Sequence, residues 1–425
     1  MRHHDIAIAA KDRRERKLPW SDSLARRGLL GRLAGIHRGR MVVREGGREH
    51  RFGAASAHCP LDVTVDIVDP RAWTEIALGG ALGAGEAYMR GWWKADDLTG
   101  VVRLFLVNRD VLESMDRGAA RLLHPVFRLA HRLNRNTRRG SRRNIQAHYD
   151  LGDDLFRLFL DDTMMYSAAV FDDTHSTLEQ ASRNKIRLLC EKLDLAPDHR
   201  LLEIGSGWGA LAVHAAKEYG CRVTTVTLSD NQLAAAKRRA EAEGVADRVD
   251  VRLCDYRDLD GTWDRIVSVE MLEAVGHEYF ETYFRKVDEL LADDGLMVLQ
   301  TITIADQNYE HARRSVDFIK RYIFPGGGLP SVTAMLDIMT RATSLTLCDL
   351  QEIGFDYART LAEWRRRFMA NLPAVRELGY SDVFIRMWEY YLCYCEGGFR
   401  ERAIGDVQIV LGKPGNRSPV GGYRL

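Results

Sequence analysis

Short apolar runs alternate with amphipathic segments through the second half of the chain. The runs suit buried strands, and the segments between them repeat apolar residues at helical spacing. This alternation predicts an α/β fold: a doubly wound, largely parallel sheet with helices on both faces and a ligand at the carboxyl ends of the strands. We expect strands over 200–204, 222–229, 248–256, 263–271 and 295–304, and helices over 178–195, 230–244 and 279–291.

The pattern continues less regularly towards the C-terminus. It predicts helices near 309–322, 331–341, 359–370 and 382–396, and closing strands near 344–350 and 404–412. Residues 1–143 differ, with short strands and turns over 41–68 and helical spacing from residue 71. We therefore expect a smaller mixed N-terminal domain over 1–143 and the α/β domain over 144–425.

Basic residues gather within 1–40 and again within 117–143, in both cases among leucines. The first segment fits either a basic amphipathic helix on an anionic lipid surface or a solvated helix packed on its own domain. The second fits an exposed linker or a strip that orders on binding. No RNA-recognition, zinc-finger or helix-turn-helix pattern accompanies the charge, so we expect phospholipid head groups rather than nucleic acid.

Composition narrows the class of protein. The 61 basic and 60 acidic residues nearly cancel, which argues against a general polyanion binder. Seven cysteines without a CxxC pair indicate reduced thiols of a cytoplasmic protein, and a chain of 425 residues needs no metal to stabilise its core. No apolar run approaches the roughly 18 residues that cross a bilayer, and the N-terminus lacks an apolar signal core. We expect a cytosolic protein that meets a membrane only at its surface.

The stretch RLLEIGSGWG is the strongest candidate for a binding turn. Gly205, Gly207 and Gly209 follow an apolar strand, where glycine permits a tight turn and lets a ligand approach the main chain beside free N–H groups. Glu203 stands two residues before the first glycine and can reach an ammonium or a hydroxyl group. Because Gly205, Gly207 and Ala210 also fit the dinucleotide fingerprint, the turn alone does not identify the ligand.

Polar residues stand at the ends of the next strands. At the end of the second strand, Thr227, Leu228 and Ser229 lead to Gln232, whose amide can bind a ribose diol. At the end of the third strand, Asp255 can accept from an adenine amine while Tyr256 covers a ring face. At the end of the fourth strand, Glu270 and Glu273 either take part in catalysis or begin the next helix at its positive end.

The chain resembles the cyclopropane-fatty-acyl-phospholipid synthases, which are methyltransferases that use S-adenosylmethionine (AdoMet). The resemblance runs from about Gly85 to Leu411, includes GEAYMRGWW in the N-terminal domain and sets a dehydrogenase aside. It implies a class I AdoMet-methyltransferase sheet, a lipid-binding N-terminal domain, a homodimer and contact with the inner face of the membrane. The segments that carry it are NIQAHYDLG, TMMYSAAVF, LLEIGSGWG, VTLSDNQ, RLCDYRDL, DRIVSVEMLEAVG, KRYIFPGGGLPS and YARTLAEWRRRFM.

The resemblance also assigns residues. It implies that Tyr166 and Ser167 hold the methionine end of AdoMet and that Gly205 and Gly207 form the floor of the AdoMet site. It also implies that Thr227 and Gln232 bind the sugar and that Asp255 and Tyr256 bind the adenine. The family binds a bicarbonate as base through four side chains. The matching positions here are Glu273, Gln300, Tyr357 and Cys395.

This chain departs from the family pattern at the base. Ala168, Ala274 and Gln300 stand where the family commonly has Cys, His and His. Gln300 can donate a hydrogen bond but cannot carry a proton, which puts ring closure in doubt more than methyl transfer. The chain resembles a sub-branch that makes methylene-branched acyl chains, so the expected product is a cyclopropane or a methylene- or methyl-branched chain. The alternatives are a degenerate lipid- and AdoMet-binding paralogue and a methyltransferase with a non-lipid acceptor.

Overall fold

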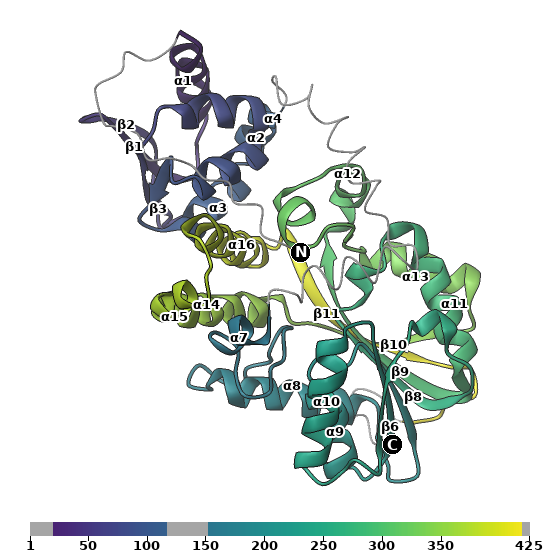
Figure 1. The fold of residues 1–425 in the computed structure, drawn as a ribbon. Coiled ribbons are helices and arrows are strands. Elements are labelled where there is room, and N and C mark those ends of the chain that lie inside the picture. The colour runs from purple at the N-terminus through teal and green to yellow at the C-terminus, as the bar shows by residue number, and fades with distance from the viewer. Residues whose placement is uncertain (1–19, 117–151, 419–425) are drawn as a thin grey trace.

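A computed structural model describes residues 20–116 and 152–418 of the chain (Figure 1). The basic segment over 117–143, the start of the segment over 1–40 and the expected domain boundary lie outside this description. Residues 20–116 form a mixed unit around a four-stranded sheet of order β2-β1-β3-β4. Its elements are α1 (Trp20–Leu33), β1 (Gly39–Glu45), β2 (Arg48–Ala54), β3 (Asp62–Ile67), α2 (Arg71–Met89), β4 (Trp93–Ala95), α3 (Leu98–Val107) and α4 (Arg109–Asp116).

The second unit is built on a seven-stranded sheet of order β10-β11-β9-β8-β5-β6-β7. Neighbouring strands from β7 to β9 run parallel, and β11 lies antiparallel between β9 and β10. The predicted doubly wound α/β fold is therefore confirmed. The strands are β5 (Arg200–Ile204), β6 (Arg222–Thr227), β7 (Val249–Leu253), β8 (Trp263–Val269), β9 (Leu291–Ile304), β10 (Thr346–Glu352) and β11 (Ile404–Gly412).

Helices cover both faces of this sheet (Figure 1). Buried side chains of three helices pack together against one face, and those of two helices pack against the other. The first layer holds α8 (Leu178–Lys192), α9 (Ala210–Glu218) and α10 (Asp230–Ala242), and the second holds α11 (Phe280–Leu290) and α13 (Val332–Ala342).

The helix expected over 309–322 is broken. The structure has α12 (Tyr309–Arg314), an extended residue at Ser315 and a π-helical turn over Ile319–Ile323. The Lys320 ammonium donates to the carbonyls of Ala312 (2.5 Å) and Ser315 (3.0 Å), so the chain folds back on the end of α12. A contact between side chain and backbone thus overrides the helical pattern of the sequence.

The two units share one hydrophobic core. The helices α14 (Gly354–Ala370) and α16 (Asp382–Arg400) contribute to the same buried cluster as α2 and α3, and α16 lies between α14 and the N-terminal unit (Figure 1). A Cβ at Gly85 of α2 would come within 2.6 Å of the Phe318 ring, so the contact requires glycine. Across the boundary, Thr99 donates to Glu396 at 3.0 Å and Tyr88 donates to Glu389 at 2.8 Å. The N-terminal unit is therefore fixed against the second unit.

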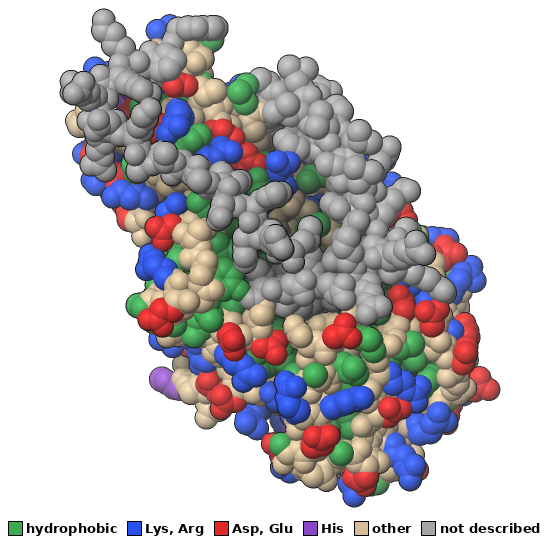
Figure 2. Space-filling view, viewed as in Figure 1, with side chains coloured by type: hydrophobic (Ala, Val, Ile, Leu, Met, Phe, Trp, Pro, Cys, Tyr) green, Lys and Arg blue, Asp and Glu red, His purple; other side chains and the backbone are tan. Residues whose placement is uncertain are grey.

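On the face of the second unit that Figure 2 shows, Lys and Arg side chains (blue) are interspersed with Asp and Glu side chains (red). This local mixing agrees with the formal net charge of +1. Within residues 20–116 and 152–418, none of the helices is both long enough and apolar enough to span a bilayer.

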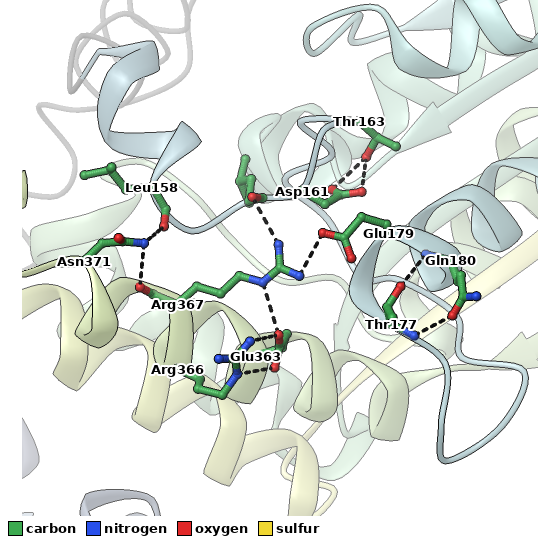
Figure 3. Close-up of polar contacts among 11 residues, drawn as sticks. Leu158, Asp161, Thr163, Thr177, Glu179, Gln180, Glu363, Arg366, Arg367 and Asn371 are labelled. Atoms are coloured by element: carbon green, nitrogen blue, oxygen red, sulfur yellow. Dashed lines mark hydrogen bonds and ion pairs between the residues drawn. The ribbon is translucent and has the colours of Figure 1, made fainter.

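A polar cluster on α14 fixes the segment that leads into the site (Figure 3). The Arg367 guanidinium donates to Glu179 of α8 at 2.9 Å, to Glu363 at 3.1 Å and to the carbonyl of Leu160 at 3.4 Å. Asn371, at the end of α14, donates to the carbonyl of Leu158 at 2.8 Å. Leu158 directly follows the short helix α7 (Asp153–Arg157), and Asn371 directly precedes α15 (Leu372–Glu377). These bonds hold the chain around residue 160 against α8 and α14.

We expect Arg367→Met to lower the free energy of unfolding by about 1–3 kcal/mol, because three acceptors lose a charged donor. Arg366→Met is the matched control. Arg366 neighbours Arg367 on α14, but its side chain is 67% exposed and it pairs only with Glu363 in the described contacts, so we expect a change within about 0.5 kcal/mol. Denaturant unfolding of both variants measures the difference, and equal losses would show that the cluster does not stabilise the segment.

Candidate active site

A cavity of about 1220 Å³ opens at the carboxyl ends of the parallel strands. Its wall combines the glycine turn after β5, the ends of β6 to β9 and residues of α14 and α16. The N-terminal unit also contributes, through Leu106 of α3 and Leu112 of α4. Most of the remaining wall is apolar, including Ile302, Phe324 and Leu361. The cavity can therefore hold a polar ligand at the strand ends and an apolar one beside it.

Gly205 and Gly207 of the glycine turn line the cavity at the end of β5. Gly205, Gly207 and Gly209 have φ of +102°, +47° and +85°, which L side chains rarely adopt. A Cβ at Gly207 would meet no protein atom within 4 Å, and Gly207 lines the cavity, so the position is kept open on the ligand side. A Cβ at Gly209 would instead come within 2.9 Å of Ala236, so this glycine allows α9 and α10 to pack closely.

Glu203 lines the cavity at the end of β5 while remaining only 4% exposed. The Thr225 hydroxyl donates to its carboxylate at 2.6 Å. Burial raises the pKa of Glu203 to about 8, against the lowering effects of the Thr225 hydrogen bond and the Lys185 charge. A positively charged ligand group beside Glu203 would favour its ionised form, so the residue suits an ammonium.

The residues expected at the sugar and the adenine all line the same cavity. Thr227 donates to the Gln232 amide oxygen at 2.8 Å, which fixes the orientation of the amide, and Leu228 follows on the wall. The Asp255 carboxylate pairs with the Arg257 guanidinium at 2.6 Å. Tyr256 is buried, and its hydroxyl has no hydrogen-bond partner among the described residues. Their roles toward a nucleoside remain predictions.

Tyr166 and Ser167 line the cavity beside the glycine turn. The Tyr166 ring stacks on Trp364 with centroids 5.2 Å apart, and its hydroxyl hydrogen-bonds that of Tyr391 at 2.9 Å. The Ser167 hydroxyl accepts from the ammonium of Lys185 at 2.7 Å. Lys185 has no exposed surface, so a buried positive charge lies directly behind the cavity wall at Ser167.

Glu270 is the centre of the polar contacts at the end of β8. Its Oε1 accepts from the backbone N–H of Ala168 at 2.7 Å and from Gln300 Nε2 at 2.9 Å, and its Oε2 accepts from the Tyr357 hydroxyl at 2.7 Å. The Glu270 backbone has φ +48°, which turns the side chain into this set of donors. Burial and the neighbouring Glu270 charge raise the pKa of Tyr357 well above its ordinary value, so its hydroxyl stays a donor.

The structure does not group the four residues matched to the bicarbonate site. Gln300 and Tyr357 meet at Glu270, whereas Glu273 Oε1 accepts from the Thr301 hydroxyl at 2.9 Å and from the Ile302 N–H. Burial and the charge of Glu270 raise the pKa of Glu273 to about 8. Cys395 lines the cavity, but no hydrogen bond in the described part of the chain joins it to Glu270. Burial raises the pKa of its thiol, which stays neutral.

The sheet order, with one antiparallel strand between two others that run parallel to the rest, and the glycine turn at its centre define a class I AdoMet-dependent methyltransferase. A sequence profile described as mycolic acid cyclopropane synthetase matches residues 136–409, and the chain belongs to this family. AdoMet is therefore its cofactor, and the open face at Gly207 together with the acid at Glu203 fits that molecule.

Relatives and solved structures agree with the family. The chain is 40% identical over 343 residues to the tuberculostearic acid methyltransferase UfaA1 of Mycobacterium tuberculosis, covering 79% of this chain and 80% of the relative. It is 37% identical over 364 residues to the cyclopropane-fatty-acyl-phospholipid synthase of Escherichia coli, covering 85% and 90%. The structure of mycolic acid cyclopropane synthase CmaA1 complexed with SAH and CTAB superposes with a TM-score of 0.60 at 35% identity, covering 64% of this chain and 98% of that one.

Several site residues are not evident from the sequence. Glu270 is one of two acids after β8, and spacing alone cannot say which one turns inward. Ala168 contributes only its backbone, which no residue pattern reveals. Lys185 lies on an amphipathic helix where a lysine usually faces water. Asp406, whose carboxylate also accepts from Gln300, is a charged residue within the apolar strand β11. This break in the apolar pattern is the sequence feature that marks Asp406 as a candidate.

We expect Gly207→Val to weaken AdoMet binding by about 100-fold or more, or about 2.8 kcal/mol, because the new side chain would occupy the open floor of the cavity. Gly244→Val is the matched control. Gly244 has φ +70° and a Cβ there would meet no protein atom within 4 Å, but the residue lies outside the cavity wall. Both variants carry a backbone strain of about 1–2 kcal/mol, and only Gly207→Val should lose affinity in calorimetric titration. Unchanged affinity would remove Gly207 from the cofactor floor.

Proposed function

We propose that this protein transfers a methyl group from AdoMet to the double bond of an unsaturated fatty acyl chain of a phospholipid, with Glu270 as the base that completes the reaction. The observation that carries the proposal is the Glu270 carboxylate, held by three donors at the wall of a largely apolar cavity. The resulting product is a cyclopropane or a methylene-branched chain, and a saturated methyl branch would require a separate hydride donor.

An unactivated alkene is a weak nucleophile, so the reaction needs a close fit and the exclusion of water. When bound, AdoMet supplies an electrophilic methyl group on a sulfonium. Glu203, Gly205, Gly207 and Gln232 line the part of the cavity that would hold it. The apolar wall at Ile302, Phe324 and Leu361 would hold the acyl chain beside it. The aromatic ring of Tyr166 lies on the same wall and can stabilise a neighbouring positive charge.

Methyl addition leaves a positive charge on the acyl chain, and a proton must then leave. The electrons of the broken C–H bond either close a three-membered ring or, after a hydride shift, form the double bond of a methylene branch. In both cases Glu270 accepts the proton. Ala168, Gln300 and Tyr357 hold its carboxylate in one orientation, so the base needs no rearrangement at the moment of transfer.

This assignment leaves no role for bicarbonate. The family resemblance implies a bicarbonate held by Glu273, Gln300, Tyr357 and Cys395. Gln300 and Tyr357 instead donate to Glu270, as does the Ala168 N–H. The protein's own carboxylate therefore supplies the same chemistry, and Glu273 is not the base. We assign Glu273 and Cys395 to the wall of the cavity.

We also propose that the protein works at an anionic membrane surface, on the cytoplasmic side, as a homodimer. Arg27 and Arg32 of α1 give the N-terminal unit a basic element, and α3 and α4 of the same unit reach the cavity wall. A phospholipid acyl chain that enters beside α4 would approach the strand ends from the N-terminal unit.

Mass spectrometry of acyl chains tests the function. The purified protein is incubated with vesicles of unsaturated phospholipid and methyl-labelled AdoMet. We expect acyl chains that gain one labelled CH2 unit, and fragmentation distinguishes a ring from a branched alkene. Bound AdoMet without labelled lipid would contradict the proposal and favour a non-lipid acceptor or a degenerate binder.

We expect Glu270→Gln to lower kcat by about 100-fold or more, because an amide cannot accept the proton, while the affinity for AdoMet stays within about threefold. Glu273→Gln is the comparison. With its pKa raised to about 8, Glu273 is mostly neutral near pH 7, and glutamine resembles that form, so we expect a loss of less than about tenfold. A larger loss in Glu273→Gln than in Glu270→Gln would reverse the assignment.

Glu270→Gly provides a second test of the same role. The backbone of Glu270 has φ +48°, which glycine adopts without strain, so this variant should fold. It frees the three donors and leaves space for a small anion. We expect an inactive variant that added bicarbonate partly restores, and a wild-type rate that does not depend on bicarbonate. Bicarbonate dependence of the wild-type protein would show that Glu270 is not the base.

A further inference from the structure

We propose that Asp406 is a positioning residue that holds a proton in the resting protein and forms, with Glu270, a carboxyl pair that carries a single negative charge. This inference rests on the proposed role of Glu270. It concerns a buried acid on β11 that does not line the cavity and that the reaction described above does not use.

One side-chain amide joins the two carboxyl groups. Gln300 Nε2 donates to Glu270 Oε1 at 2.9 Å and to Asp406 Oδ2 at 3.3 Å. Gln408 Nε2 donates to Gln300 Oε1 at 3.1 Å, which fixes the orientation of the Gln300 amide. Gln300 and Gln408 lie opposite each other in the antiparallel pair of β9 and β11, and Asp406 stands two residues before Gln408 on the same face. The sheet thus places Asp406 beside Glu270.

The donors are divided unequally between the two acids. Glu270 accepts from Ala168, Gln300 and Tyr357, whereas Asp406 accepts only from the shared Gln300 amide among the described residues. Asp406 Oδ1 is buried and has no hydrogen-bond partner in the described part of the chain. Hydrogen bonds to a carboxylate favour its ionised form, and burial without them favours the neutral form. The negative charge therefore stays on Glu270 and the proton on Asp406.

The charges around the pair agree with this division. Burial raises the pKa of Asp406 well above its usual range, and the charge of Glu270, together with that of Glu273 where it is ionised, raises it further. The ammonium of Lys185 on α8 acts in the opposite direction. Tyr357, which faces the pair from α14, stays a neutral donor. Two adjacent ionised carboxylates would repel each other in this buried site, so the pair holds one proton between them.

The neutral Asp406 keeps Glu270 available as a base. If Asp406 were ionised, its repulsion would favour protonation of Glu270, and the base would be lost before the reaction began. In the resting protein Glu270 is ionised and Asp406 is neutral. When a C–H bond of the substrate breaks, Glu270 takes the proton, and both acids are then neutral until one proton leaves to solvent.

Infrared spectroscopy of the full chain detects a protonated carboxyl group without turnover. Protein labelled with isotopic aspartate, near neutral pH, should show an aspartic acid C=O band that is absent from Asp406→Asn. Asp356→Asn is the matched control, because Asp356 is a partly buried acid on α14 that accepts from the Phe171 N–H, and its replacement should leave this band in place. A band that is unchanged in Asp406→Asn would overturn the proposal.

Glu270→Gln offers a second infrared measurement that does not depend on the folding of the Asp406 variant. Removing the negative charge at position 270 favours ionisation of Asp406, so the pH at which the aspartic acid band disappears should fall. A titration identical to that of the wild-type protein would contradict the pairing. Because neither infrared measurement requires product, a failure here is distinguishable from a failure of the proposed methyl transfer.

Kinetics separate positioning from direct chemistry. Asparagine copies the neutral form of Asp406, so Asp406→Asn should keep kcat within about fivefold of wild type, whereas Asp406→Leu should lose about tenfold or more with unchanged AdoMet affinity. The leucine variant removes the polar partner of Gln300 while keeping the branched shape of the side chain. A kcat in Asp406→Asn as low as that of Glu270→Gln would show that Asp406 must ionise or transfer the proton itself, and would overturn the positioning role.

Discussion

A carboxylate that is withdrawn from water must find its hydrogen-bond donors within the protein, and this requirement governs the site around Glu270. Its donors come from the segment before α8, from β9 and from α14. Each of these elements must be fixed for the charge to be stable. The Arg367 cluster, the antiparallel pairing of β9 with β11 and the packing of α14 on α16 thus have a common consequence: they hold the three donors in place.

The backbone of Glu270 shows where this arrangement costs free energy. A non-glycine residue with φ +48° is strained by about 1–2 kcal/mol, which three hydrogen bonds to an ionised acceptor can offset. The strain also explains why two acids three residues apart differ so much. Glu270 turns into the donors of the cavity wall, while Glu273 accepts hydrogen bonds from Thr301 and Ile302 near the end of β9.

The sequence allowed prediction of the sheet because each strand is a short apolar run bounded by turn residues, and its glycine turn was recognisable because only glycine suits those backbone angles. The helix over 309–322 was predicted wrongly because a lysine beyond its break bonds back to its last carbonyls. The cluster at Glu270 could not be assembled from local patterns. Ala168 lies 102 residues from Glu270, and Gln300 lies 106 residues from Asp406, so only the folded chain brings them together.

Both units contribute to the wall of the cavity. Leu106 and Leu112 of the N-terminal unit complete a wall whose strand-end side belongs to the α/β unit. An exchange of N-terminal units between relatives would therefore change the shape of the cavity itself, including the part proposed to hold the acyl chain. In this protein, the shape of the cavity is a property of the junction between two folds.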